Sequence, residues 1–236
     1  MKVLIIAAHP DDEVLGMGGT ILKHSTQGDR VKVVYMTTGI TARRSLEYHN
    51  ITNYEYDLKQ NSKLKKEIEY LRQDARNACK LLKVKEVKFY NYPDNEMDTV
   101  PLLKVIKTIE KEIDESKPDR IYTNHYGDLN IDHRTVFNAT LTACRPIDNK
   151  IKELICFEVI SSSEWSYPTN FKPNYFVNIK SQLDKKIKAM QAYRNEIRKF
   201  PHPRSTDNLK MVAGRWGAIS GNYAAEAFEI IRKIDK

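Results

Sequence analysis

The sequence predicts an α/β protein, and two observations lead to that class. Apolar runs of strand length recur along the chain, beginning with residues 3–7, and amphipathic helical patterns such as that of residues 64–82 lie between them. Strands that alternate with helices form parallel sheets with right-handed crossovers. Because the 236 residues show no break in composition, we expect a single domain over residues 1–236, with a Rossmann-like, mostly parallel sheet flanked by helices.

The periodicity of the first half of the chain assigns its elements in order. Residues 3–7 have no polar interruption, which is typical of a strand buried on both faces. Residues 38–62 are polar and rich in turn residues, so we expect a long loop there. Gly28 and Pro118 end the first and third helices. The expected order is strand 3–7, helix 16–27, strand 31–37, helix 64–82, strand 87–90 and a helix from residue 102 to Pro118.

The second half continues the alternation and then becomes less regular. Residues 161–168 form a loop rich in hydroxyl and aromatic side chains, which suit the rim and the apolar face of a sugar ring. Residues 201–205 contain too much proline for regular structure. The expected order is strand 120–123, helix 133–144, strand 154–160, an edge strand at 175–179, helix 183–197 and a closing helix at 223–234.

Four titratable residues follow the first strand directly. His9 is separated by Pro10 from three consecutive carboxylates, Asp11 to Glu13. In an open α/β sheet, ligands bind at the carboxyl ends of the strands. His9 and Asp12 can converge on one cation while Asp11 stays unligated as a base. The same carboxylates could instead stabilise the N-terminus of the helix that follows, so a second histidine elsewhere in the chain is needed to favour a metal site.

His133 supplies that second histidine. It lies in the loop that follows the predicted strand 120–123, so both histidines occupy strand exits. A His, Asp, His set with an open position is typical of catalytic rather than structural zinc. The same ligands could hold ferrous iron or another divalent metal. Asp132 beside it is expected to cap the following helix, or to orient a histidine of the loop.

These motifs together resemble the PIG-L/LmbE-like family of metal-dependent N-deacetylases. The resemblance rests on His-Pro-Asp-Asp-Glu at residues 9–13 and Asp-His-Arg at 132–134, and it extends to residues 92–95, 202–205 and 221–228. It implies that His9, Asp12 and His133 bind zinc and that Asp11 is the general base. It also implies hydrolysis of an N-acetyl group on an N-acetylglucosamine-type sugar, free, nucleotide-linked or part of a glycoconjugate.

The second motif departs from the family pattern at one position. Family members often have His-Pro-Asp-His there, and the first histidine helps to stabilise or protonate the reaction intermediate. This chain has Asn130 at that position. An amide can donate a hydrogen bond to an oxyanion but cannot deliver a proton at neutral pH. His125, five residues upstream, is a candidate substitute, with a purely structural loop histidine as the alternative.

Five further residues are candidates for substrate contact. Arg43 and Arg44 in the long loop could hold a carboxylate or phosphate. Asp94 lies in a proline turn at a strand exit, where it could accept a substrate hydroxyl. His202 and Arg204 could meet an anionic group. Solvent-facing arginines and an ordinary proline turn are the alternatives.

Composition limits the partners that we expect. The net charge is +8, but Lys and Arg are mixed with Glu and Asp along the helices, which is typical of a solvated surface rather than of a nucleic-acid interface. No apolar run reaches membrane-spanning length and no signal peptide is recognised, so we expect a cytoplasmic protein without membrane insertion. Cys79, Cys144 and Cys156 have no metal-ligand or disulfide spacing. The sequence does not determine the oligomeric state, and a homo-oligomer is one of the alternatives.

The resulting hypothesis is a zinc-dependent N-deacetylase acting on a small N-acylated sugar. The alternative enzyme is a related metal amidase that removes another acyl group or cleaves a thiol conjugate. A non-catalytic metal-binding or sugar-binding module would need the ligands without the base, and Asp11 argues against it. An iron oxygenase would need oxygen and a reductant, and a nucleic-acid binder would show steep salt dependence.

Overall fold

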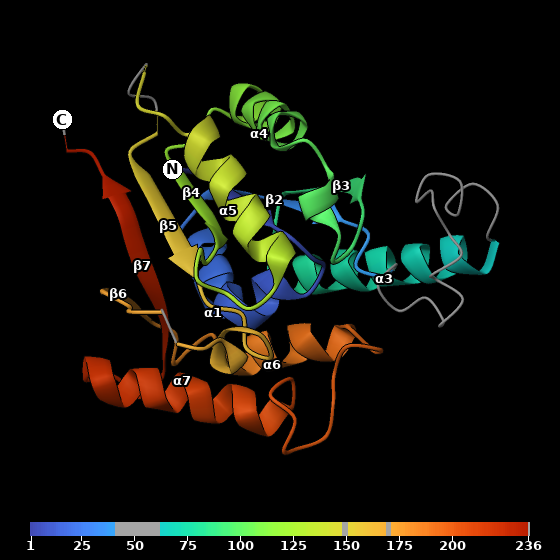
Figure 1. Cartoon of the computed structure of the whole chain (residues 1–236). Helices are drawn as coiled ribbons and strands as arrows, with labels where there is room; N and C mark the ends of the chain where they lie inside the picture. Colours follow the sequence, from blue (N-terminus) through green and yellow to red (C-terminus); the bar gives the residue numbers. More distant parts are fainter. Residues whose placement is uncertain (41–61, 148–150, 169–170, 236) are drawn as a thin grey trace.

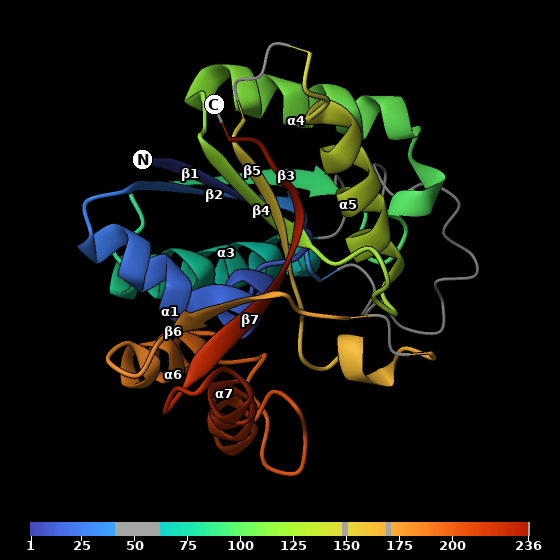
Figure 2. The same ribbon diagram turned by 90° about the vertical axis from the view of Figure 1, so that its left-hand side faces the viewer.

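A seven-stranded sheet lies between two layers of helices (Figures 1 and 2). The computed structural model describes residues 1–40, 62–147, 151–168 and 171–235. The strands are β1 (Lys2–Ala7), β2 (Arg30–Thr37), β3 (Glu86–Tyr92), β4 (Arg120–Asn124), β5 (Glu153–Phe157), β6 (Tyr175–Asn178) and β7 (Ala225–Lys233). The helices are α1 (Asp12–Thr26), α3 (Ser62–Leu81), α4 (Leu102–Ser116), α5 (Ile131–Ala143), α6 (Leu183–Ala192) and α7 (Thr206–Ser220).

The sheet has the order β3-β2-β1-β4-β5-β7-β6. Strands β1 to β5 pair in parallel, whereas β7 pairs antiparallel with both β5 and β6. This arrangement confirms the predicted α/β class with a mostly parallel sheet. Among the described residues, no helix combines the length and the apolar character needed to span a bilayer.

The central strand β1 explains why the first apolar run has no polar interruption. Its odd-numbered residues, such as Ile5, pack in a core with helices α1, α3 and α6. Its even-numbered residues, such as Ile6, pack in a second core with α4 and α5. Figure 2 shows these helix layers on opposite faces of the sheet. All three cysteines are likewise buried and free.

Strands β1 and β4 mark the point where the strand order reverses. After β1 the chain continues to β2 and β3 on one side, and it then returns to β4 and β5 on the other. Such a reversal opens a crevice at the carboxyl ends of the two strands. The backbone N–H of Ala8 donates to Asn124 Oδ1 (2.9 Å), which joins the two strand exits. The residues that follow β1 and β4 therefore meet at one place.

The C-terminal assignment differs from the prediction. Residues 225–233 form strand β7 and not a helix, because β5 and β6 offer pairing edges on both of its sides. The spacing of the apolar residues in this segment fits the period of a helix and that of a strand, so pairing with the neighbouring strands determines which one forms. The prediction assigned no element to residues 206–220, which form α7. Its start and end carry recognisable signals: Ser205 Oγ accepts the N–H of Asn208, and Gly221 is left-handed (φ 70°).

Helix α1 is broken at Met17, and a buried ion pair stabilises the break. Met17 has non-helical angles (φ −148°, ψ 22°). Lys186 Nζ donates to Leu15 O at the end of the first piece (2.9 Å). Glu226 accepts the N–H groups of Gly19 (2.9 Å) and Thr20 (2.6 Å) at the start of the second. Lys186 and Glu226 lie 2.6 Å apart and are both buried.

We expect Lys186→Met to lower the free energy of unfolding by about 3–5 kcal/mol, because it leaves the buried Glu226 carboxylate without its cation. Chemical denaturation monitored by circular dichroism measures this change. Lys188→Met on the exposed side of the same helix is the matched control, with an expected change within about 0.5 kcal/mol. Equal stabilities of the two variants would show that the pair contributes little.

Candidate active site

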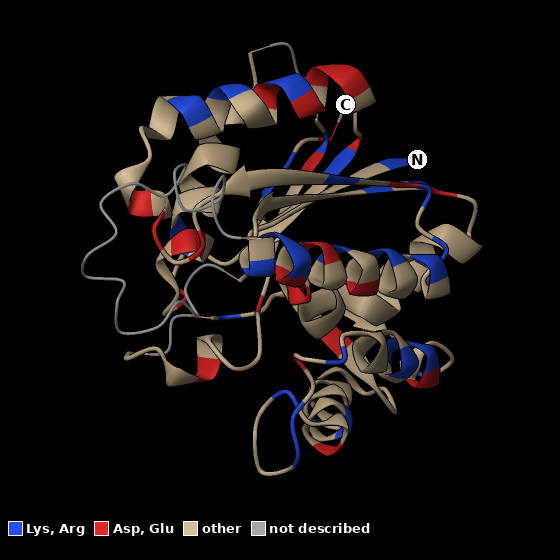
Figure 3. Ribbon diagram, turned by 90° about the vertical axis from the view of Figure 1, so that its right-hand side faces the viewer, with Lys and Arg blue, Asp and Glu red and all other residues tan. Residues whose placement is uncertain are grey.

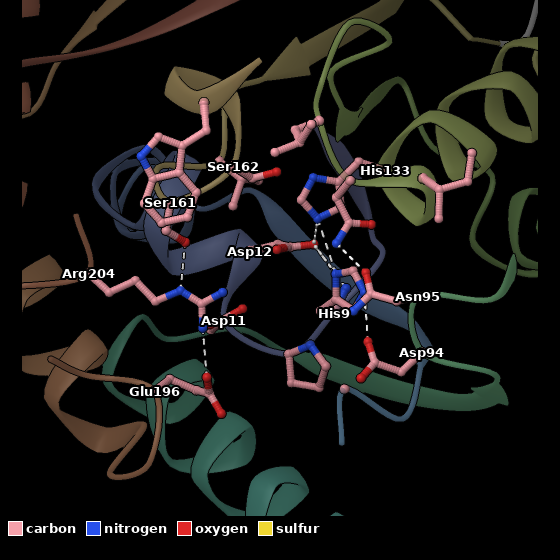
Figure 4. A pocket seen from close by; sticks show the side chains of 17 residues that line it. His9, Asp11, Asp12, Asp94, Asn95, His133, Ser161, Ser162, Glu196 and Arg204 are labelled. Carbon is pink, nitrogen blue, oxygen red and sulfur yellow. Dashed lines mark hydrogen bonds and ion pairs between the residues drawn. The ribbon is translucent and has the colours of Figure 1, made fainter. Parts of the chain in front are cut away.

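A cavity of about 540 Å³ opens at the carboxyl ends of β1 and β4 (Figure 4). Its volume lies within the range of about 300–1,000 Å³ that is usual for small-molecule sites. Seven of the residues that the sequence singles out line its wall: His9, Asp11, Asp12, Asp94, Asn130, His133 and Arg204. The structure thus brings together residues from the two strand exits and from the C-terminal third of the chain.

Three of these side chains form a compact triangle of donor atoms. His9 Nδ1 lies 3.1 Å from His133 Nε2 and 3.5 Å from Asp12 Oδ2, and the last two atoms are 3.3 Å apart. Ligand atoms placed about 2.0–2.1 Å from a tetrahedral zinc would be about 3.3 Å apart. All three residues are buried. The donor set and its spacing therefore fit a small divalent ion.

Backbone geometry places this triangle. His9 follows β1 directly, and Asp12 and His133 lie in the first turns of α1 and α5. Asp12 Oδ2 also accepts the N–H of His9 (2.9 Å) and the side-chain N–H of Asn124 (3.0 Å). The exits of β1 and β4 are thus tied to the same carboxylate, which fixes the positions of the three donor atoms.

Carboxylate oxygens lie beside the ring nitrogens of His9 and His133 that point away from the triangle. His9 Nε2 lies 3.0 Å from Asp94 and 3.0 Å from Asp132, and His133 Nδ1 lies 3.1 Å from Asp128. Metal-ligating histidines usually have such a carboxylate partner, which fixes the tautomer and aims the other nitrogen inward. The sequence alone does not identify Asp128, although it lies only five residues before His133.

The pKa directions at the site show that it stabilises positive charge. Burial alone lowers the pKa of His133, but Asp12 and Asp128 raise it to about 9. Burial likewise opposes charge on His9, yet its carboxylate partners raise its pKa well above the ordinary value. The two histidines in turn hold the pKa of Asp12 well below its usual range, although burial acts in the opposite direction.

His9, Asp94 and Asp132 form a second cluster that could hold an ion. Asp132 already accepts the backbone N–H groups of Asn95 (2.6 Å) and Met97 (3.0 Å). It therefore suits the role of orienting His9. The expected capping role belongs instead to Asn130, whose Oδ1 accepts the N–H of Asp132 (2.8 Å).

Asp11 lies beside the triangle in a constrained conformation. Its backbone is left-handed (φ 115°), and its N–H donates to Glu13 (3.2 Å). Glu13 in turn accepts the hydroxyl of Tyr193 (2.7 Å), so a buried chain of contacts holds the turn. Burial raises the pKa of Asp11 to about 8, although the Arg204 guanidinium opposes this shift. A carboxyl group with a raised pKa is suited to accept and return a proton.

Arg204 makes three contacts around Asp11. Its Nη1 lies 3.1 Å from Asp11 Oδ2 and 2.7 Å from Glu196 Oε2. Its Nε donates to Ser161 Oγ (2.7 Å). Figure 4 shows the guanidinium between Asp11 and Glu196. Arg204 thus lines the cavity while it contacts groups of the protein, and its predicted contact with an anionic substrate group stays a prediction. No local sequence pattern indicates Glu196.

Two other predicted residues, His125 and His202, do not line the cavity. His125 points elsewhere: its ring packs on Tyr126 and its Nε2 faces Glu229 (3.3 Å), so the geometry does not support the acid role. His202 accepts the N–H of Arg204 and packs its ring against Trp165. Arg43 and Arg44 lie outside the described residues.

The three serines that follow β5 hold charged residues of the site in place. Ser162 Oγ and Ser163 Oγ both donate to Asp128, which holds His133. The neighbouring Ser161 contacts Arg204, as described above. The hydroxyl-rich loop that the sequence associates with a sugar ring is therefore used in large part to position the site.

We expect Asp128→Asn to weaken metal binding by about 10–100-fold, because His133 loses the carboxylate that makes it more basic. Competition with a chelator measures the affinity directly. Asp98→Asn, at an exposed position of the same chain, is the matched control and should bind metal like the wild type. An unchanged affinity in Asp128→Asn would contradict the orienting role.

Comparison with known proteins gives a family match over more than half of the chain. The family described as PIG-L, GlcNAc-PI de-N-acetylase, matches residues 4–144. That range contains Asp11 and the three residues of the donor triangle. Arg204, Glu196 and Trp165 lie beyond it.

Individual relatives are distant but cover most of the chain. A diacetylchitobiose deacetylase from Thermococcus kodakarensis is 25% identical over 247 aligned positions, covering 99% of this chain and 84% of the relative. A probable N-acetyl-alpha-D-glucosaminyl L-malate deacetylase 2 from Bacillus cereus is 25% identical, with 82% and 83% covered. The structure of N,N'-diacetylchitobiose deacetylase from Pyrococcus horikoshii superposes with a TM-score of 0.73 at 24% identity, covering 98% and 83%.

Proposed function

Because the chain belongs to the PIG-L, GlcNAc-PI de-N-acetylase family, we propose that it is a metal-dependent hydrolase that removes the acetyl group from an N-acetylated amino sugar. The donor triangle of His9, Asp12 and His133 with Asp11 beside it is the observation that carries this proposal. Its relatives support it, since two of them are named as deacetylases of N-acetylated sugars.

His9, Asp12 and His133 would hold the ion, and zinc is the metal that this donor set fits best. Ferrous iron or another divalent metal could use the same ligands. The chemistry that a bound ion supplies is polarisation of the amide carbonyl and a lower pKa of its water. The carboxylates behind the two histidines keep both rings aimed at this point.

Asp11 carries the proton in the proposed reaction. It takes one proton from the attacking water and gives it to the nitrogen of the leaving amine, so that acetate and a free amino sugar result. Arg204 and Glu13 hold Asp11 in place through its carboxylate and its backbone. Asn130 donates one side-chain N–H to Asn95 (2.7 Å), and its second N–H is the one proposed to reach the oxyanion. Asp94 is proposed to accept a substrate hydroxyl.

The surface supports a small-molecule substrate. Lys and Arg are interspersed with Asp and Glu along the described helices (Figure 3), which is typical of a solvated surface. The cavity, by contrast, gathers its charged groups around the donor triangle.

Acetate release from a panel of N-acetylated sugars tests the proposal. The panel contains free, phosphate-linked and nucleotide-linked forms, and the enzyme is assayed after chelator treatment and after reloading with zinc. We expect release that depends on added metal. No release from any sugar by enzyme with stoichiometric metal would contradict the proposal, and release from another N-acyl compound would favour the related metal amidase.

A further inference from the structure

We propose that the site selects an uncharged sugar conjugate, and that Glu196 determines this preference by occupying Arg204. This inference rests on the proposed function and adds the class of substrate. Family membership leaves the class open, since one relative is named for diacetylchitobiose, which is neutral, and another for a malate conjugate, which is anionic. The charges at the cavity wall distinguish the two.

Acidic side chains dominate the wall of the cavity. Within the described ranges, its lining includes the carboxylates of Asp11, Asp12, Asp94 and Glu196, whereas Arg204 is its one arginine and no lysine contributes. Even with Asp11 protonated, a divalent ion and Arg204 would only balance the other three carboxylates. The described part of the wall therefore offers no net positive charge to a phosphate or carboxylate, and like charges placed together are costly in a desolvated site.

Arg204 has no free two-nitrogen edge for an anion, because both Nε and Nη1 already make contacts within the protein. Its guanidinium is shared between Asp11 (3.1 Å) and Glu196 (2.7 Å), and its Nε bonds to Ser161. Arginines that recognise substrate anions present a free planar edge for two parallel hydrogen bonds. A bound anion would compete with two carboxylates and would draw Arg204 away from the base. Glu196 is 1% exposed, so drawing Arg204 away would weaken the ion pair of a buried carboxylate.

Trp165 provides the remaining feature of an uncharged sugar site. It lines the same cavity with 55% of its surface exposed, and its ring makes a T-shaped contact with the ring of His202 (centroids 6.2 Å apart, 83°). A partly exposed flat indole offers apolar surface to the C–H face of a sugar ring. The wall thus combines an apolar platform with carboxylates that accept hydroxyl hydrogens.

The ratio of kcat/KM values for matched substrates tests this inference. The substrates are N-acetylglucosamine conjugates that differ only in the group on the anomeric oxygen, which is a second N-acetylglucosamine, malate or phosphate. We expect the wild type to prefer the neutral conjugate by at least about tenfold. Glu196→Gln should reduce that preference by about tenfold, because it removes one negative charge from the wall and replaces the ion pair at Arg204 Nη1 by a weaker hydrogen bond.

Two features keep the comparison interpretable. Glutamine has the shape of glutamate and still accepts a hydrogen bond from Arg204, and any general loss of activity cancels in the ratio. Glu67→Gln, which removes the same charge at an exposed position of α3, should leave the ratio unchanged. Thermal unfolding verifies that each variant is folded.

The outcomes separate this inference from the proposed function. Acetate release from the malate or phosphate conjugate at the neutral rate or faster would overturn the inference and leave the deacetylase intact. An unchanged ratio in folded Glu196→Gln would overturn the role of Glu196. Absence of release from all three conjugates and from every sugar of the panel above, with stoichiometric metal bound, would overturn the proposed function itself.

Discussion

Asp11→Asn is expected to keep the metal and to lower kcat by about 10²–10⁴-fold, the usual contribution of a general base. The side chain keeps its shape but can no longer accept the proton of the attacking water. Metal content by elemental analysis and acetate release by a coupled assay give the two readouts. We expect one metal ion per chain in both proteins.

This substitution is well matched to the backbone at residue 11. Asp11 has a φ of 115°, and asparagine enters left-handed conformations at least as readily as aspartate. Alanine would add strain there, so its effect on turnover could not be separated from an effect on the turn. Wild-type activity in Asp11→Asn would overturn the base assignment, and loss of the metal would make Asp11 a ligand.

His133→Ala is expected to lose both the metal and the activity. Removing one of three protein ligands leaves only His9 and Asp12, and a two-ligand site binds zinc weakly. The substitution also leaves Asp12 and Asp128 buried without the ring between them. Metal content and acetate release after dialysis against zinc measure the loss.

His202→Ala is the control for metal content, since His202 does not line the cavity. It should retain one ion per chain. Full metal content in His133→Ala would move the ion to the second cluster, where His9 faces Asp94 and Asp132. Asp94→Asn would then lose the metal, whereas the donor triangle predicts that it does not.

The sequence predicts the centre of the site well because its proposed ligands lie close after strands. A buried run fixes β1, and His9 follows that run after Ala8; the run before residue 124 likewise fixes β4, and His133 follows it after one short loop. Parallel strands direct their carboxyl ends to one edge, so two local patterns are enough to bring His9 and His133 together. The roles assigned to these residues stay predictions, but the structure places them as expected.

The remaining parts of the site and of the fold depend on contacts between segments that are distant in the sequence. Arg204 is 193 positions from Asp11, and nothing local indicates that they meet. Asp132 looked like a helix cap, but Asn130 takes that place and leaves Asp132 for His9. The apolar residues of segment 225–233 fit a helix as well as a strand, and only the free edges of β5 and β6 decide between them.

The break in α1 makes the folding of this early helix depend on two residues that are translated late. Its second piece begins at amides that bond to Glu226, and its first piece ends at a carbonyl that bonds to Lys186. Buried backbone groups need such partners, so helix α1 cannot complete its bonding while the ribosome still holds those two residues. During synthesis β1 and the proposed ligands His9 and Asp12 therefore emerge well before they can reach their final setting, which requires that residues 186 and 226 have been translated.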